Sequence, residues 1–375
     1  LLYAAEALGI NVVENLTIEP EQPSYQTEIA RLDQADPDAI LWEMDEVTAG
    51  TFFGELVTAG MTDVPLLTTF IASFGWVQEA LVAAMGTELL AEVLVPVFRY
   101  STLDVGGYEF YDETFASLDS SHIAYEQYGP DHYTRAHYDC VTTMALAMVA
   151  AGSTDPAVYN AEMVGVLAPG GTVVNSYAEG VAALEAGDDI QYVGANGAYD
   201  LNEYHNITGV YGNYAWDPSA GGLVIEGVLS EAQLAELKFG GDAAWEPAAE
   251  EPAAEDVTIG VFMAMTGPTD YEGIQAMNGC LPAVYRINEA GGVLGSQVEC
   301  VEFDTRGTPT EAVPEMARML ATASNLVGVV GPSSAEAAST AEGFADADMV
   351  MCSVAGDARF DKTTNPYYYR LVPSD

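Results

Sequence analysis

The chain has 375 residues, of which 49% are hydrophobic, so two or three domains with packed cores are expected. It carries 57 acidic residues against 10 basic ones, a formal net charge of -47 at pH 7. The chain therefore lacks the excess of basic residues that binding to nucleic acid or to an anionic membrane requires. No apolar run approaches the ~20 residues of a membrane span. A salt-rich or acidic habitat favours such a surface, and an ordinary acidic extracellular protein is an equally good interpretation.

The first part of the chain alternates predicted strands and helices at a spacing typical of a parallel sheet covered by helices. Because the chain opens as though in mid-helix, we interpret it as processed or partial. A helix over 1–9 is followed by predicted strands at 11–18, 39–44, 64–70 and 89–100. The predicted helices between them are 26–34, 48–59 and 76–85. Longer helices, a hairpin region, two strands and a capped helix follow at 108–118, 131–151, 194–209, 210–216, 222–228 and 230–237.

A strand–helix–strand unit of the kind that builds parallel sheets is predicted late in the chain. An apolar run over 257–265 stops at a Thr-Gly-Pro turn, and the next helix ends at Gly291-Gly292 before a second apolar run reaches Asp304. The predicted elements after it are a helix at 310–323, a strand at 326–330, a helix ending at 345, and strands at 349–354 and 367–372. Residues 239–256, FGGDAAWEPAAEEPAAED, form a linker by composition.

Several motifs in this late region resemble the start of a type I periplasmic solute-binding protein of the branched-chain amino-acid kind, the Leu/Ile/Val-binding-protein-like family. They are TGPTDYEG, NGCLPAVYRINEAGGVLG and VECVEFDT. Residues 331–334 and 353–357 fall where that family places its next two ligand loops. Three earlier stretches resemble the family's later segments: 38–40 with the helix ending at Gly60, Tyr138-Asp139, and 192–200.

The order of these segments differs from that of the family. Residues 1–238 resemble the C-terminal portion of a binding-protein domain, 239–256 are an acidic Pro/Ala linker, and 257–375 resemble the N-terminal lobe portion. The resemblance implies an α/β, two-lobed fold in which each lobe is a mostly parallel sheet flanked by helices. One lobe would combine 257–375 with 98–205, and the other 1–97 with 206–238. About one strand–helix unit is missing between the two ends, so the chain is either circularly permuted or a fragment of tandem copies.

Two loops of the late region are candidates for binding a ligand. Ser333 and Ser334 end a strand and open a helix, where hydroxyls and free N–H groups suit a carboxylate. The alternative is that a serine simply caps the helix. By the resemblance, Ala355, Gly356 and Asp357 would provide a carbonyl and a second polar contact. Asp357 would meet a ligand ammonium or repel a carboxylate.

Further candidates come from the resemblance on both sides of the expected cleft. Tyr271 would lie across the cleft mouth, and the alternative is an ordinary surface aromatic. Trp42 would form an aromatic wall, while Glu43 and Asp45 would supply an anionic partner or belong to a solvated turn.

The position at which amino-acid binders of this family place a glutamate for the ammonium is occupied differently here. This chain offers Phe70 or Ser73 after the Leu66-Leu67-Thr68-Thr69 strand. That departure argues against an aliphatic amino acid and indicates another small ligand, or a domain that binds none.

Catalytic and metal motifs are not found, and no cofactor is expected. His132 and His137, five apart on a helix, are expected to be exposed polar residues. Four cysteines without CxxC spacing make a zinc site unlikely on sequence grounds. Cys280 and Cys300 lie on a helix and strand that should pack together, so a disulfide and two buried thiols are both open.

The function that the resemblance implies is an extracytoplasmic solute-binding protein rather than an enzyme. It would capture a small polar ligand (an amino acid, amide or related carboxylate) between two hinged lobes and present it to an ABC permease. The periplasm or cell surface is expected, and the linker is similar to the tether of a lipid-anchored lipoprotein. The alternative is a structural extracellular assembly of tandem or domain-swapped copies, and a ligand-sensing receptor domain is a third interpretation.

Overall fold

The computed structural model describes residues 10–68, 70–100, 106–118, 128–129, 131–207, 211–229, 256–323 and 325–374. The chain divides into two compact units. Unit 1 comprises Leu1–Ser101 and Val210–Leu234, and unit 2 comprises Thr102–Gly209 and Ala235–Asp375. Both units contain parallel strands flanked by helices, as the sequence predicts. The predicted helices at 1–9 and 230–237, and the linker up to residue 255, lie outside the described residues.

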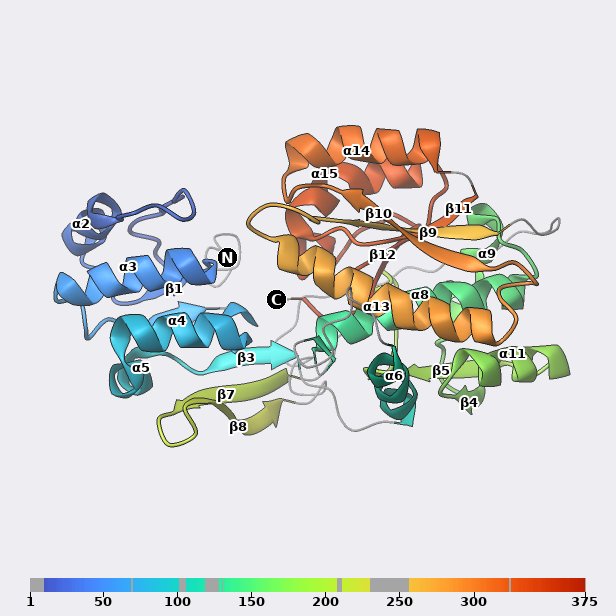
Figure 1. Ribbon diagram of the computed structural model, residues 1–375, viewed down its shortest axis with the longest axis horizontal. Coiled ribbons are helices and arrows are strands. Elements are labelled where there is room, and N and C mark those ends of the chain that lie inside the picture. Colours follow the sequence, from blue (N-terminus) through green and yellow to red (C-terminus); the bar gives the residue numbers. More distant parts are fainter. Residues whose placement is uncertain are drawn as a thin grey trace. The chain divides into compact units, whose positions relative to one another are not determined.

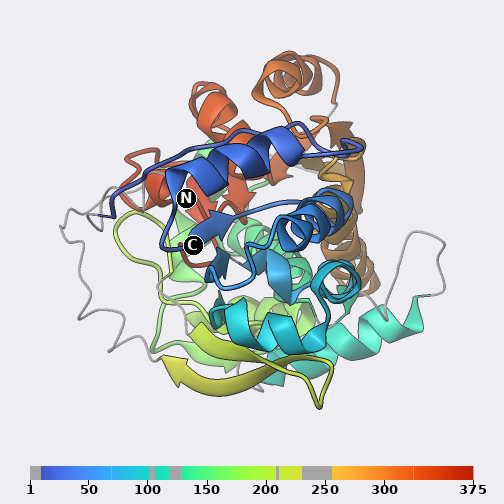
Figure 2. The same ribbon diagram turned by 90° about the vertical axis from the view of Figure 1, so that its left-hand side faces the viewer.

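Unit 1 contains a small parallel sheet and an antiparallel one. Strands β1 (Ile40–Trp42) and β2 (Leu66–Thr68) pair in parallel. Strand β3 (Val97–Tyr100) pairs with a long antiparallel hairpin, drawn in yellow-green in Figure 2, of β7 (Tyr211–Asp217) and β8 (Gly222–Leu229). The helical elements are α2 (Gln26–Ala35), α3 (Glu46–Thr58), η1 (Phe70–Ser73), α4 (Gly75–Met85) and α5 (Thr87–Val93).

Two of the predicted strands in unit 1 are wrong. Residues 11–18 have no regular secondary structure. An apolar pattern alone does not make a strand, because the strand also needs a neighbour to complete its ladder of hydrogen bonds. Residues 89–100 are divided between helix α5 and strand β3. Leu90 and Val93 of this short helix are buried, so the single apolar run in the sequence belongs to both a helix and a strand.

Unit 2 is built on a five-stranded parallel sheet in the order β10-β9-β11-β12-β13. The strands are β9 (Val257–Met263), β10 (Val298–Asp304), β11 (Leu326–Val330), β12 (Met351–Ser353) and β13 (Tyr368–Arg370). Helices α14 (Pro309–Thr322) and α15 (Ser334–Ala345) cover one face, and α13 (Asp270–Glu289) and α8 (His132–Ala151) cover the other (Figure 1). Every residue of β9 is buried, as expected for a strand covered on both faces.

The remaining elements of unit 2 surround α8. They are α6 (Gly106–Ser117), α9 (Pro156–Tyr159), α10 (Glu162–Gly165), α11 (Tyr177–Ala186), β4 (Thr172–Val174), β5 (Ile190–Gly194) and β6 (Gly197–Ala198). Helix α8 is buried along almost its whole length. The expectation that His132 and His137 are exposed is therefore wrong: their exposed fractions are 2% and 0%. Neighbouring helices cover α8 on several sides, which its local sequence could not reveal.

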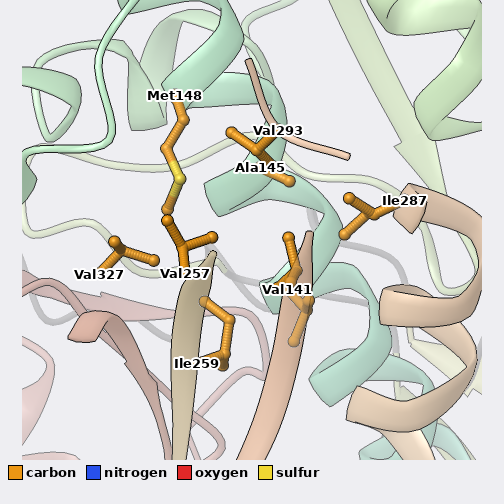
Figure 3. A pocket seen from close by; sticks show the side chains of 9 residues that line it. Val141, Ala145, Met148, Val257, Ile259, Ile287, Val293 and Val327 are labelled. Atoms are coloured by element: carbon orange, nitrogen blue, oxygen red, sulfur yellow. The ribbon is translucent and has the colours of Figure 1, made fainter. Parts of the chain in front are cut away.

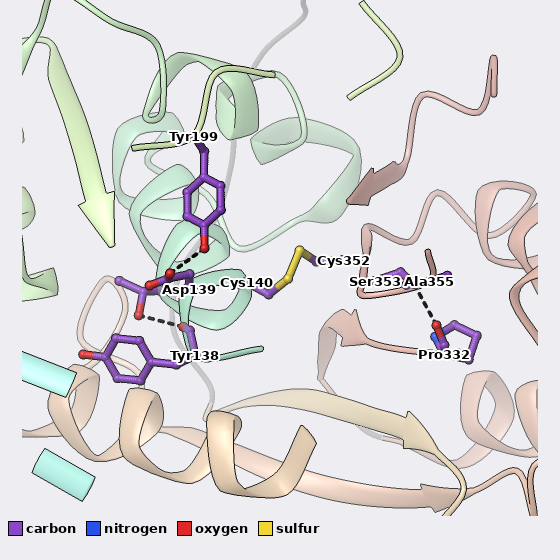
Figure 4. Close-up of a disulfide and its surroundings, with 9 residues drawn as sticks. Tyr138, Asp139, Cys140, Tyr199, Pro332, Cys352, Ser353 and Ala355 are labelled. Atoms are coloured by element: carbon purple, nitrogen blue, oxygen red, sulfur yellow. Dashed lines mark hydrogen bonds between the residues drawn. A yellow bond between two sulfur atoms is a disulfide. The ribbon is translucent and has the colours of Figure 1, made fainter. Parts of the chain in front are cut away.

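A buried carboxylate joins α8 to the β5–β6 turn. Asp139 accepts hydrogen bonds from the hydroxyls of Tyr192 (2.8 Å) and Tyr199 (2.6 Å). It also accepts the backbone N–H groups of Ala195 (2.8 Å) and Asn196 (3.0 Å). Burial raises the pKa of Asp139, and these four hydrogen bonds oppose that shift. Figure 4 shows Asp139 with Tyr199 beside the neighbouring disulfide.

Segments that are far apart in the sequence interlock within unit 2. A disulfide joins Cys140 of α8 to Cys352 of β12, across a separation of 212 residues (Figure 4). The hydroxyl of Tyr159 donates to the carbonyl of Val327, and the hydroxyl of Tyr177 donates to Gly292 (2.9 Å). Residues 131–207 and 256–374 therefore share one core.

Candidate functional site

The carboxyl ends of the parallel strands in unit 2 form the candidate binding edge. The first strand of this sheet, β9, lies between the second, β10, and the third, β11. The connection that follows β9 and the connection that follows β11 consequently lie on opposite faces of the sheet. Open α/β sheets bind ligands in the crevice between two such neighbouring strands. Tyr271 lies in the first turn of the helix after β9, Ser334 opens the helix after β11, and Asp357 follows β12. The topology brings these three predicted positions to one edge.

The loop after β11 is held close to β9. The Gly331–Pro332 peptide is cis, and Gly331 has φ +97°. A Cβ at Gly331 would lie 2.4 Å from the carbonyl oxygen of Phe262, so only glycine fits this approach. Ser333 then occupies the N-cap position of α15 without making a side-chain cap. Its hydroxyl donates instead to the buried carboxylate of Glu336.

Direct hydrogen bonds tie the loop after β12 to the loop after β11. The hydroxyl of Ser353 donates to the carbonyl of Pro332 (2.7 Å), as Figure 4 shows, and accepts the N–H of Ala355 (2.9 Å). The N–H of Asp357 donates to the hydroxyl oxygen of Ser334 (3.3 Å). The two loops therefore form one connected group, in which Ser334 has a structural partner besides any ligand.

Asp357 is engaged within its own turn. Its carboxylate accepts the N–H of Arg359 (2.8 Å) and two bonds from the guanidinium of Arg359 (2.8 and 2.6 Å). Although partial burial raises the pKa of Asp357, the hydrogen bonds and charge of Arg359 outweigh this effect and lower the pKa. A ligand ammonium would therefore compete with Arg359 for this carboxylate.

The candidates in unit 1 lie at and after the carboxyl ends of β1 and β2. Trp42 is 4% exposed and packs edge-on against Phe53, with ring centroids 5.0 Å apart. Trp42 pairs in register with Thr68. Among the described residues, neither Nε1 of Trp42 nor Oγ1 of Thr68 has a hydrogen-bond partner, although both atoms are buried. These two atoms are polar groups that a ligand could satisfy.

The acidic candidates of unit 1 differ from one another. Asp45 caps helix α3 by accepting the N–H (2.9 Å) and hydroxyl (2.6 Å) of Thr48. This capping bond also explains why the helix begins at Glu46, two residues before the predicted start. Glu43 is exposed on the loop between β1 and α3. Phe70 opens the 3-10 helix after β2.

Cys280 pairs with Cys300, one of the two alternatives that the sequence left open. Two features of the candidate edge were not predicted from the sequence, and the first is the disulfide between Cys140 and Cys352 beside the candidate loop. The second pair could have been inferred by elimination once the first was accepted. Arg370, at the end of β13, is also buried at this edge, and no local pattern distinguishes it from a surface arginine.

An apolar seam lies between α8, α13 and the sheet of unit 2 (Figure 3). It is too narrow to hold a water molecule, and its lining is entirely apolar. Val257, Val298 and Val327 line it from the starts of their strands, opposite the carboxyl ends. The seam is a packing feature rather than a site for a polar ligand. In the described part of the chain, no three His, Cys, Asp or Glu side chains gather to hold a metal ion.

The comparison with protein families bears on the segment that contains the sheet of unit 2. The model of the family described as periplasmic binding protein matches residues 256–375. This part of the chain is similar to that family, and it also matches curated relatives over a shorter stretch.

Two of these relatives are Leu/Ile/Val-binding proteins. BraC3 of Rhizobium johnstonii is 41% identical over 61 residues, which are 16% of this chain and 17% of that protein. The Leu/Ile/Val-binding protein of Escherichia coli K12 is 38% identical over 60 residues, 16% of each. The matched stretch thus spans about a sixth of the length of these curated relatives.

Solved structures of binding proteins are also similar over about a third of the chain. LivJ of Streptococcus pneumoniae, in complex with isoleucine, is 25% identical, with a TM-score of 0.30 and coverage of 32% of this chain and 34% of that one. A Leu/Ile/Val/Thr/Ala-binding protein of Brucella ovis is 24% identical, with a TM-score of 0.29 and coverage of 32% and 33%. Because these TM-scores are low, the similarity to this family is supported mainly by the sequence matches over part of the chain.

Proposed function

We propose that this chain is an extracytoplasmic solute-binding protein that captures a small polar ligand and presents it to an ABC permease. The observation that carries the proposal is the carboxyl edge of the unit 2 sheet. There a hydrogen bond joins the loop at Ser334 to the loop at Ala355–Asp357. Both loops lie where the strand order of the sheet reverses, in the segment that the family model matches. In the described residues, no helix has the length and apolarity needed to cross a membrane.

The ligand would be an amino acid, an amide or a related carboxylate. Ser334 and the N–H groups of the first turn of α15 suit an acceptor such as a carboxylate. Tyr271 and the loop at Ala355–Asp357 would complete the part of the binding site that unit 2 supplies. Ser333 would contribute indirectly, because its hydroxyl donates to the carboxylate of Glu336. Trp42, Glu43, Asp45 and Phe70 remain the candidates from unit 1. Of these, Trp42 has the strongest support, because its buried Nε1 has no partner in the described structure.

A thermal-shift screen of the whole chain tests this function. The panel contains L-leucine, L-isoleucine and L-valine together with small amides and carboxylates that lack the ammonium group. A binder present at 100 times its Kd stabilises the folded state by about 2.7 kcal/mol, which is several degrees in Tm. Stabilisation by one chemical class identifies the ligand. No shift with any compound at millimolar concentration would count against ligand capture.

The second candidate function is a structural assembly of tandem or swapped copies, and the predicted order of the segments is the observation that favours it. In the structure, residues 131–207 pair with 256–374 of the same chain, through the Cys140–Cys352 disulfide among other contacts. This packing supports the proposed assignment of 98–205 and 257–375 to one lobe. Non-reducing peptide mapping with intact mass distinguishes the two. A Cys140–Cys352 link within one chain supports permutation, and the same link between copies supports assembly.

A further inference from the structure

Arg370 is a buried cation beside the loop that is proposed to hold the ligand. It is 1% exposed at the end of β13, where its backbone pairs in register with Ser353. Its backbone N–H donates to the carbonyl of His205 (2.9 Å), so the strand end is held from both sides. A buried guanidinium is costly unless its hydrogen-bonding groups are satisfied. In the described structure the Nε of Arg370 has no partner, so the bonds made by its two terminal nitrogens must offset the cost of burial.

Those partners lie in the candidate loop and the turn after it. One guanidinium nitrogen, Nη1, donates to the carbonyl oxygens of Ala355 and Asp357, each at 3.3 Å. The other, Nη2, donates to the carboxylate of Asp361 at 2.5 Å. The planar guanidinium thus holds two backbone carbonyls and one charge in a fixed arrangement, which a single ammonium could reproduce only in part.

The orientation of the loop follows from these bonds. A trans peptide places its N–H opposite its C=O. When Arg370 draws the carbonyls of Ala355 and Asp357 toward itself, the N–H groups of the same peptides, those of Gly356 and Ala358, point away from the guanidinium. Gly356 N–H has no partner among the described residues. The Asp357 carbonyl also accepts the N–H of Phe360 (3.0 Å), so Arg370 acts most directly on the Ala355 carbonyl and hence on the direction of the Gly356 N–H.

We propose that Arg370 is a positioning residue: its guanidinium holds the carbonyls of Ala355 and Asp357 and thereby fixes the backbone donors of the loop that faces the ligand. The ligand part of this inference rests on the proposed function, whereas the loop part does not. Arg370 is assigned no direct contact with a ligand.

Hydrogen–deuterium exchange on the full chain tests the loop part. Arg370→Gln is expected to speed exchange of the Asp357 amide, which donates to Ser334, at least tenfold, with the amides of β9 and β11 little changed. Arg370→Lys keeps the charge and one donor and should restore part of the protection. Arg318→Gln removes the same charge from an exposed pair with Glu315 on α14 and should change nothing in the loop. An equal increase throughout the sheet, or none in the loop, would overturn the proposal.

Two further measurements cover the other outcomes. If Arg370→Gln does not fold, Asp361→Asn, which weakens the anchor of the guanidinium, should still raise loop exchange at least threefold, and no increase contradicts the proposal. Titration calorimetry with L-leucine then addresses the ligand part, with Arg370→Lys expected to weaken binding about tenfold at a nearly unchanged Tm. Absence of leucine binding by the wild-type chain would count against the proposed function for that ligand, while the exchange result would still decide the role of Arg370.

Discussion

Ser334 connects the two candidate loops, because its hydroxyl oxygen accepts the N–H of Asp357 while its own hydrogen can be donated outward. Ser334→Ala should weaken binding of whichever compound stabilises the protein about 10- to 100-fold, the value of a hydrogen bond to a charged group. Its effect on the free energy of unfolding should stay near 1 kcal/mol. Calorimetric titration and urea unfolding measure the two effects.

Ser339→Ala is the matched control, since the Ser339 hydroxyl donates only to the carbonyl of Glu336 in its own helix. Unchanged affinity in Ser334→Ala would remove this serine from the site.

His137 makes the stability of unit 2 depend on pH. Burial lowers its pKa to about 3, and among the described residues neither ring nitrogen has a hydrogen-bond partner. Below the unfolded-state pKa of about 6.5, the unfolded chain binds a proton that the folded chain does not. Stability from neutral His137 is therefore complete above pH 6.5 and falls by about 1.4 kcal/mol per pH unit down to about pH 3. Urea unfolding between pH 7 and 4 should show a shallower slope for His137→Gln than for wild type. Parallel curves would assign the pH dependence to other groups.

At the scale of elements, the contact between α8 and α13 depends on a small residue. A Cβ on Gly279 would lie 2.5 Å from both the His137 Cβ and the Thr134 carbonyl oxygen, so the backbones must separate. Gly279→Ala should destabilise unit 2 by about 1–3 kcal/mol or more.

Gly54→Ala, within α3, is the comparison, because its Cβ would meet only the Ala84 side chain at 4.0 Å. This variant should gain up to about 1 kcal/mol from helix propensity. If both variants gain stability in urea unfolding, the close approach of α8 and α13 is not as the structure has it.

The two disulfides should contribute unequally to stability. Chain-entropy arguments give about 5 kcal/mol for Cys140–Cys352, with its separation of 212 residues, and about 3 kcal/mol for Cys280–Cys300, with its separation of 20. The paired variants Cys140→Ala/Cys352→Ala and Cys280→Ala/Cys300→Ala should follow that order in chemical unfolding. The reverse order would indicate that the segments interlock without the long-range link.

At the scale of the whole molecule, the net charge of -47 opposes the compact state. Salt shortens the screening length from roughly 30 Å at 0.01 M to roughly 3 Å at 1 M, so repulsion between surface carboxylates falls. Tm should therefore rise with NaCl over this range, most steeply at the low end. Sucrose at matched osmolality is the control for solvent exclusion, and a Tm that is insensitive to NaCl would contradict self-repulsion.

Much of the architecture could be predicted because it depends on local signals. The turn at Gly267-Pro268 and the helix end at Gly291-Gly292 predict the β9–α13–β10 unit, and both glycines of that helix end have positive φ. The strand proposed at 11–18 could not be tested locally, since a strand exists only with a partner. Likewise, the positions of Ser334 and Asp357 at one edge were predictable, but the Arg359 pair that engages Asp357 and the Thr48 bond that engages Asp45 were not.

Composition and short-range pattern were sufficient for the acidic charge balance and most helices of the described regions, and sequence motifs for the resemblance of 257–375 to a binding-protein lobe. Only the tertiary structure shows that α8 and β12, 212 residues apart at their cysteines, share a core, and that Arg370 is buried against the Ala355 and Asp357 carbonyls. The physical reason is the distance along the sequence over which each interaction acts. Helix ends and turns depend on residues within a few positions, whereas burial and pairing depend on which distant segments the folded chain brings together.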